Sequence, residues 1–178
     1  MSRLPQADES KQPELKAAYE RISKTRGYVS NILKGFSNAP EGLGHFAVLG
    51  EYVRYRSDIP PRTRELSILA IAASIEYAWA HHLPHAVKAG VSQAELDELK
   101  RGGIPATANP AERAAIAYIR EYANLGQVRD ATFAELRKHY TPRQVTDLTL
   151  LGGYFVALGS AINALQIELE PQFGPRQT

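Results

Sequence analysis

The side chains best suited to proton transfer gather in one short stretch of the chain. Three of the five histidines and the only tryptophan fall between residues 79 and 85. The ordinary pKa of an imidazole lies near neutrality, so His82 could act as a general acid or base. Glu65 could hold that ring in the tautomer needed for proton transfer, and Tyr77 could donate a hydrogen bond to a substrate oxygen. These residue types predict acid–base chemistry on a small molecule.

Each of these side chains also has a purely structural interpretation. An acid such as Glu65 near the start of a helix is favoured by the helix dipole, and Arg62 or Arg64 could pair with it. Tyr77 and Trp79 could be hydrophobic anchors whose polar ends find hydrogen-bond partners. The sequence leaves both interpretations open.

The spacing of the histidines is also compatible with metal binding. His81 and His85 stand at i and i+4, and His82 and His85 at i and i+3, so either pair could share a helix face. Pro84 interrupts the group, however, and no third ligand is suitably spaced. The chain has no cysteine, which excludes disulfides, thiolate metal sites and thiol redox catalysis. We therefore expect no metal at these histidines, which would then be surface or pocket residues.

Basic residues precede this stretch. Around a turn at Asp58 stand four arginines, Arg54, Arg56, Arg62 and Arg64. They could form a solvated rim, or they could collect an anionic substrate, because guanidinium groups suit carboxylates. The net charge of the chain is only +2, with acids and bases interspersed, so nucleic acid is not expected as a partner.

The elements that must position these residues are helices. Segments 62–75 and 77–89 carry apolar residues in helical patterns, and two prolines precede the first. Three later helices open with capping boxes, at Ser92-Gln-Ala-Glu95, Asn109-Pro-Ala-Glu112 and Thr141-Pro-Arg-Gln144. Asp130 predicts the cap of a further short helix. With no convincing strand, the sequence predicts one all-α domain over residues 13–178 after a disordered N-terminus over residues 1–12.

The uncharged segment from Leu148 to Ile167 is long enough to span a bilayer. Its glycines and polar residues favour a buried core helix instead, so we expect no membrane partner. The N-terminus lacks the apolar core of a signal peptide, which predicts a cytoplasmic protein.

Glycines give this last helix, predicted over 142–168, a small-residue face. Gly152, Gly159 and Asn163 share one side of it, which could pack closely on a neighbour, line a pocket or form a subunit contact. Asn163 would need a hydrogen-bond partner if buried. Alternatively, the helix could break at Gly152 and Gly153.

The motif around His82 resembles a known family. The sequence from Arg64 to Ser92 is similar to the signature region of the carboxymuconolactone decarboxylase-like superfamily, whose relatives include the AhpD-type alkylhydroperoxidases. The matching residues are Arg64-Glu65-Leu66, Glu76-Tyr77, Trp79, His82 and the segment from Ala86 to Ser92. The last apolar segment resembles the final helix of this family, with Tyr154 and Asn163 in matching columns.

Departures from the family pattern limit the chemistry. Peroxidase relatives carry a Cys-x-x-Cys pair whose columns fall on Ile75 and Ala78 here. Without a thiolate the chain has no peroxidatic nucleophile, so thiol-dependent alkylhydroperoxidase activity is not expected. Many cysteine-free relatives have a glutamate in the column of Ala78, and this acid is absent too.

The resemblance implies an all-α AhpD-like helical bundle that forms a homo-oligomer, a trimer or hexamer. It also implies a cofactor-free lyase of decarboxylase type that acts on a small carboxylated lactone or related acid. The catalytic residues would be His82, Glu65 and Tyr77, and the substrate would contact Trp79, His85, Arg64, Tyr154 and Asn163. The alternative is a non-catalytic small-molecule-binding or stress-associated scaffold with the same fold.

Overall fold

The computed structural model describes residues 2–124 and 127–174, and within these ranges it contains helices and no strand. The α-helices are α1 (Pro13–Arg26), α2 (Asn31–Lys34), α3 (Pro40–Glu51), α4 (Pro61–Ala72), α5 (Glu76–Lys88), α6 (Gln93–Lys100), α7 (Pro110–Ala123), α8 (Asp130–His139) and α9 (Pro142–Leu165). Shorter turns are η1 (Glu9–Lys11), the π-turn η2 (Tyr52–Arg56) and η3 (Pro171–Phe173). The predicted all-α class is confirmed.

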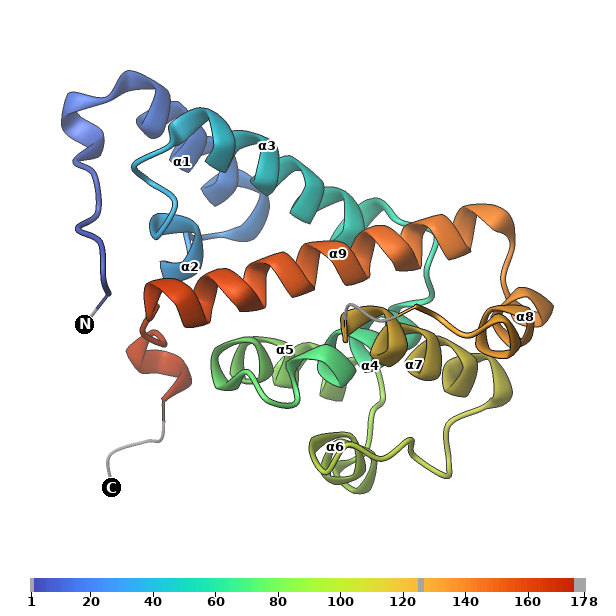
Figure 1. Ribbon diagram of the computed structural model, residues 1–178. Coiled ribbons are helices and arrows are strands. Elements are labelled where there is room, and N and C mark those ends of the chain that lie inside the picture. The colour runs from blue at the N-terminus through green and yellow to red at the C-terminus, as the bar shows by residue number, and fades with distance from the viewer. Residues whose placement is uncertain (1, 125–126, 175–178) are drawn as a thin grey trace.

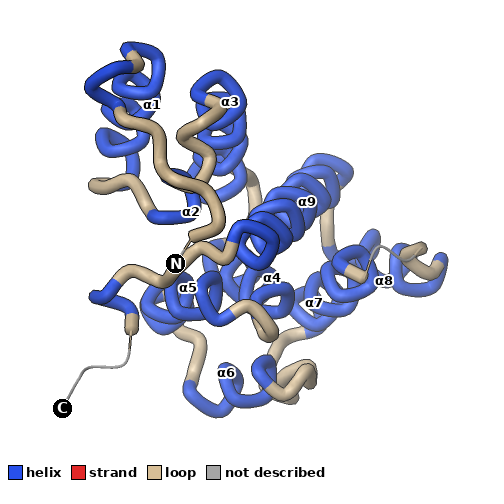
Figure 2. Tube along the Cα trace, turned by 60° about the vertical axis from the view of Figure 1, so that its left-hand side comes forward, coloured by secondary structure: helices blue, strands red, loops and turns tan. Residues whose placement is uncertain are grey.

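The helix α9 is the axis of the molecule. It runs between α1–α3 on one side and α4–α7 on the other (Figure 1), and a view turned by 60° keeps this order (Figure 2). Its packing partners include α4 and α7, and the larger hydrophobic core forms around these three helices and α5. A smaller core lies under α1 and α3. Among the described helices, α9 alone is long and apolar enough to cross a membrane, yet here it packs as a core helix.

The glycines of α9 allow close packing and do not break the helix. The helix is continuous through Gly152 and Gly153, so the alternative of a break there is wrong. A Cβ at Gly152 would lie 2.9 Å from the ring of Tyr122, and one at Gly159 would lie 2.4 Å from Ile75. The small side chains therefore let α7 and the start of α5 approach the backbone of α9.

Helix caps fix where the shorter helices begin. All three predicted capping boxes are present, with reciprocal hydrogen bonds at the starts of α6, α7 and α9. The prediction for α8 needs a correction, because Arg129 is its N-cap and Asp130 is its first residue. An acid in that first turn still suits the helix dipole.

One arginine connects two of these capping boxes. Arg62, near the start of α4, donates to Glu95 at 2.6 Å and to Glu112 at 2.9 Å. Both carboxylates are buried and belong to the capping boxes of α6 and α7. Arg62 therefore joins the N-termini of three helices, and this role is structural.

The N-terminal segment has defined contacts from residue 2 onwards, where the Ser2 hydroxyl donates to the carbonyl of Leu165 at 3.4 Å. The amide of Ala7 donates to the Ser37 hydroxyl at 2.9 Å, and the Asn38 side chain donates to the carbonyl of Pro5 at 2.9 Å. The amide of Arg3 donates to the carbonyl of Leu165 at the end of α9.

Candidate active site

A buried histidine–glutamate pair joins α4 to α5. Nδ1 of His82 lies 2.9 Å from Oε2 of Glu65, and both residues are less than a tenth exposed. The aliphatic surroundings of α4 bury the carboxylate, and the ring of Phe155 packs edge-on against the imidazole. The sequence alone did not fix the position of Glu65 relative to the histidines, and the structure shows that it reaches His82.

The electrostatics of the pair set its resting protonation. Burial lowers the pKa of His82 to about 4, although the hydrogen bond that the ring donates to Glu65 acts in the opposite direction. Burial also raises the pKa of Glu65, but the hydrogen bond and charge of His82, together with Arg64, lower it below its ordinary value. At neutral pH the pair is therefore a neutral imidazole and a carboxylate. Nδ1–H donates to Glu65, which leaves the lone pair on Nε2 as a proton acceptor.

The free side of the imidazole faces a narrow cavity. His82, Ala78 and Tyr154 line a chamber of about 30 Å³, which is the space of roughly one water molecule. An adjoining outer cavity of about 210 Å³ opens toward the surface. The two cavities share wall residues Arg26, Ser30, Arg54 and His81. A small planar substrate would occupy the outer cavity and place one end toward His82.

Two arginines give this cavity a positive character. Within the described ranges, neither Arg26 nor Arg54 pairs with a carboxylate: Arg26 donates to the carbonyl of Ala47 at 3.4 Å, and Arg54 lies 5.2 Å from the ring centre of Tyr55. The charge of Arg54 also contributes to the low pKa of His82. Guanidinium groups with free donors at a cavity wall suit a carboxylate.

A buried tyrosine hydroxyl is free to meet a ligand. Tyr154 is 2% exposed, and its hydroxyl has no hydrogen-bond partner among the described residues. Space for it comes from Gly50, where a Cβ would lie 2.3 Å from that hydroxyl and 2.6 Å from Nη2 of Arg26. Because a buried unpaired hydroxyl is costly, this one is a candidate donor to a bound oxygen.

Tyr77 lines the same cavity, but its hydroxyl is already engaged. It donates to Oε1 of Glu170 at 2.8 Å and accepts from the amide of Ile32 at 3.1 Å. Burial raises the pKa of Tyr77, and the Glu170 carboxylate raises it further. The hydroxyl of Tyr77, which we expected to bind a substrate oxygen, is thus occupied by hydrogen bonds within the protein. The hydroxyl of Tyr154 has no such partner among the described residues.

Glu170 contacts Tyr77 and His81 at the site, and no motif in the sequence predicts this role. It follows α9 by five residues and accepts hydrogen bonds from Tyr77, from His81 at 2.7 Å and from the amide of Asn31 at 2.6 Å. The ring of Phe173, three residues later, packs on His81 with a centroid distance of 4.2 Å. The segment after α9 therefore completes one wall of the outer cavity.

The remaining predicted ligand contacts lie in different places. His85 is exposed and lines the outer cavity, in agreement with a role near the substrate. Arg64 pairs with Glu65 at 3.5 Å behind the imidazole. Trp79 packs against Lys100, and Asn163 is exposed in another groove. Nine residues separate Asn163 from Tyr154 along α9, about two and a half helical turns, so the two side chains point in opposite directions.

The histidines of α5 do not assemble a metal site. His81 and His82 contact different carboxylates, Glu170 and Glu65. The described parts of the chain contain no group of three His, Cys, Asp or Glu side chains arranged to hold a metal ion.

Comparison with known proteins places this site in a family. Residues 40–121, which include Glu65 and His82, match the model of the Carboxymuconolactone decarboxylase family. The recognition made from the motif around His82 is confirmed, and the absence of cysteine sets the chain apart from thiol-dependent relatives. No curated protein sequence matched the chain.

Solved structures show the same fold across nearly the whole chain. A variant of the debrominase Bmp8 in complex with 2,3,4-tribromopyrrole has a TM-score of 0.79 at 16% identity, covering 97% of this chain and 96% of the debrominase. An AhpD-core, peroxidase-related protein from Ralstonia eutropha JMP134 has a TM-score of 0.79 at 17% identity, covering 97% and 94%. A peroxidase-related protein from Silicibacter sp. TM1040 has a TM-score of 0.77 at 18% identity, covering 96% and 92%. At these identities the similarity establishes the AhpD-like fold.

The buried pair predicts a pH-dependent stability. The folded pKa of His82, about 4, lies below the ordinary value of 6.5, so the unfolded chain binds this proton more readily between those values. The free energy of unfolding should therefore fall by a few kcal/mol, as an order of magnitude, when the pH drops from 6.5 towards 4. Glu65, whose pKa is lowered from 4.5, adds a further loss below that value. Urea unfolding across this range measures the slope, which His82→Gln should flatten. An unchanged slope in the variant would contradict the assignment of a neutral, buried imidazole.

Proposed function

We propose that the protein is a cofactor-free acid–base enzyme that acts on a small carboxylated lactone or a related acid. The observation that carries this proposal is the imidazole of His82: Glu65 holds it on one side, and the other side lines a cavity with unpaired arginines and a free tyrosine hydroxyl. Proton transfer, anion binding and oxygen stabilisation are the three functions that such a reaction needs.

In the proposed reaction, the substrate loses one carboxylate as carbon dioxide. For a substrate with two carboxylates, Arg54 and Arg26 hold the one that stays. The bond to the departing carboxylate breaks, and its electron pair moves into the lactone carbonyl to give an enolate. The hydroxyl of Tyr154 donates to the enolate oxygen. His82 takes up a proton from water when the anionic substrate enters, since negative charge raises the pKa of an imidazole, and delivers that proton from Nε2 to carbon.

Substrate size and charge follow from the cavity. A volume of about 210 Å³ admits a single small ring with its substituents. The arginines select an acid over a neutral ring, and the aromatic residues Tyr28, Tyr55 and Phe173 suit a flat body. The homo-oligomer and the cytoplasmic location implied by the resemblance stay predictions.

The competing proposal is a non-catalytic binding scaffold that uses the same cavity. The two differ in one observable, which is carbon dioxide release from a panel that includes 4-carboxymuconolactone and related carboxylated lactones. The neutral ring 2,3,4-tribromopyrrole, bound by the debrominase variant of the same fold, serves as a binding probe without a carboxylate. Binding of the acids without turnover would favour the scaffold.

Arg54→Gln should weaken substrate recognition more than the chemical step. Hydrogen bonds to a charged group are worth about 1.5–3 kcal/mol, so we expect KM for the acid that is turned over to rise about 10-fold or more, with a smaller change in kcat. Arg56→Gln is the matched control, because Arg56 pairs with Glu51 and is not in the cavity wall. Equal effects of the two substitutions would remove Arg54 from the proposed site.

A further inference from the structure

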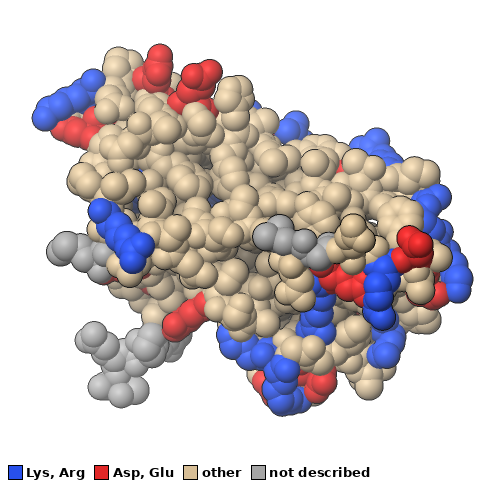
Figure 3. Space-filling model, viewed as in Figure 1, with Lys and Arg blue, Asp and Glu red and all other residues tan. Residues whose placement is uncertain are grey.

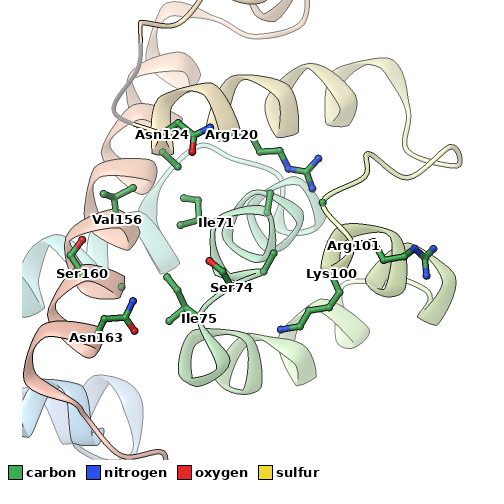
Figure 4. Close-up of a pocket in the computed structure, with 15 residues that line it drawn as sticks. Ile71, Ser74, Ile75, Lys100, Arg101, Arg120, Asn124, Val156, Ser160 and Asn163 are labelled. Carbon is green, nitrogen blue, oxygen red and sulfur yellow. The ribbon is translucent and has the colours of Figure 1, made fainter.

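A second groove lies away from His82, between α4, α6, α7 and α9. Its volume is about 560 Å³, within the range of small-molecule sites. Figure 4 shows Val156, Ser160 and Asn163 of α9 along one wall, with Arg120 and Lys100 across from them. The apolar side chains Ile71 and Ile75 lie between the two walls.

The charge of this groove has one sign. Its lining includes three cations, Lys100, Arg101 and Arg120, and none of the described lining residues is Asp or Glu. Figure 3 shows both basic and acidic side chains in the region of α6, whose last residue, Lys100, lines this groove. A groove lining with this charge raises the local concentration of small anions.

Arg120 has no carboxylate in direct contact among the described residues. It is half-buried, and its one hydrogen bond among the described residues runs from Nη2 to the carbonyl of Gly103 at 3.0 Å. Burial lowers the pKa of Arg120, and Glu98 opposes this only through a longer-range attraction. The carboxylate of Glu98 pairs directly with Arg101 at 2.8 Å, and the Arg101 side chain points out of the groove (Figure 4). The guanidinium of Arg120 therefore retains donors for an external anion.

The groove also offers polar side chains without hydrogen-bond partners among the described residues, two on α9 and one just after α4. In the part of the chain that the structure describes, the side chains of Ser74, Ser160 and Asn163 make no hydrogen bond to the protein, and all three are exposed to the groove. With the aliphatic floor, these side chains would contact the uncharged part of a ligand whose acidic end meets Arg120.

We propose that this groove is a second ligand site, which binds small amphipathic carboxylates. The carboxylate pairs with Arg120 and Lys100, and the apolar body lies over Ile71 and Ile75. Asn163, the residue that family resemblance linked to ligand contact, serves this second groove and not the cavity at His82. The site is separate from the proposed active site, because α9 directs Phe155 and Leu158 to one cavity and Val156 and Gly159 to the other.

The chain carries its own reporter for this binding. Trp79 is the only tryptophan, and its ring centre lies 4.5 Å from Nζ of Lys100 at the groove. A carboxylate that draws Lys100 away from the ring removes a cation–π contact and changes the fluorescence of Trp79. Titration with benzoate should therefore give a saturable change, whereas benzamide, of the same shape without the charge, should give none.

Substitutions then locate the bound benzoate. Arg120→Gln should weaken benzoate binding about 10-fold or more, since it removes a charged hydrogen-bond donor. Ser160→Phe, at an exposed position of α9, should block the groove without removing a contact within the protein. Lys138→Gln is the matched control and should change the affinity less than about 2-fold, because Lys138 forms an exposed ion pair with Glu135 and does not line the groove.

Three outcomes would overturn the proposal. Equal binding of benzoate and benzamide would remove the anion requirement. A fluorescence change abolished by Arg54→Gln but retained in Arg120→Gln would assign benzoate to the cavity at His82 alone. A change in sedimentation of the ligand-free protein caused by Ser160→Phe, with no benzoate binding to the wild type, would assign the groove to a second copy of the chain.

Discussion

Replacement of His82 by alanine should lower carbon dioxide release from the carboxylated lactone that is turned over by about two to four orders of magnitude, the usual contribution of a positioned acid or base. The imidazole contacts the buried carboxylate of Glu65 and lines the inner chamber. Without it, the chamber loses the group that delivers a proton from Nε2 to carbon, and Glu65, an ionised carboxylate, has no proton to supply in its place. Turnover with the wild type and the variant, compared at equal folded fraction by circular dichroism, measures the effect.

The control for this experiment is His45→Ala. His45 lies on α3, where its side chain is 82% exposed, so its removal changes the histidine content without touching the cavity. A further variant, Glu65→Gln, keeps the size of the partner but removes its charge, and it should reduce kcat less than His82→Ala does. Full activity of His82→Ala would end the acid–base proposal.

Arg62→Ala should cause a large loss of stability, because this one guanidinium pairs with two buried carboxylates. Burial alone would raise the pKa of Glu95, but its hydrogen bonds, with Arg62 as the foremost donor, lower that pKa to about 2. Loss of Arg62 leaves Glu95 and Glu112 buried without their cation, which should cost about 3 kcal/mol. The midpoint of urea unfolding gives this difference, and Arg56→Ala, which removes an exposed ion pair with Glu51, should change it by less than about 1 kcal/mol.

The pH dependence of the free energy of unfolding distinguishes the loss of the Arg62 charge from the loss of its packing contacts. A carboxyl whose folded pKa lies below its ordinary value of 4.5 stabilises the fold above that pH, and the stabilisation disappears as the pH falls towards 2. The difference in the free energy of unfolding between wild type and Arg62→Ala should therefore become smaller as the pH drops through this interval. A difference that stays constant would indicate that Arg62 acts through its aliphatic stem alone.

Local patterns were sufficient to predict the helices, whereas the pairing of Glu65 with His82 was one of two interpretations that the sequence left open. Capping boxes and proline positions depend on contacts within a few residues, so the starts of α6, α7 and α9 could be read from the sequence. The motif around His82 likewise lies within consecutive helices, and Glu65 needed only the turn between α4 and α5 to reach it.

The walls of the cavity could not be predicted in this way. Arg26 and Glu170 meet the histidines of α5 only after α1 and the segment beyond α9 have packed, and nothing in their local sequence indicates that distant contact. The prediction that Asn163 contacts a ligand near His82 has a different weakness. It came from the alignment with the family, and an alignment does not say which side of α9 faces the imidazole. Helical periodicity could have separated Asn163 from Tyr154, because nine residues rotate a side chain to the opposite face.

The distribution of the cavity walls along the chain has an evolutionary consequence. The family segment, residues 40–121, contains Glu65, His82 and Arg54, whereas Arg26, Tyr154 and Phe173 lie outside it. The acid–base pair of the proposed reaction and the residues that would select its substrate are thus encoded in different parts of the gene. If the proposed activity holds, sequence change in the flanking parts would alter the preferred acid while leaving the proton donor intact. Paralogues that share this motif are therefore expected to differ most in the termini, and ligand preference should follow those termini when they are exchanged.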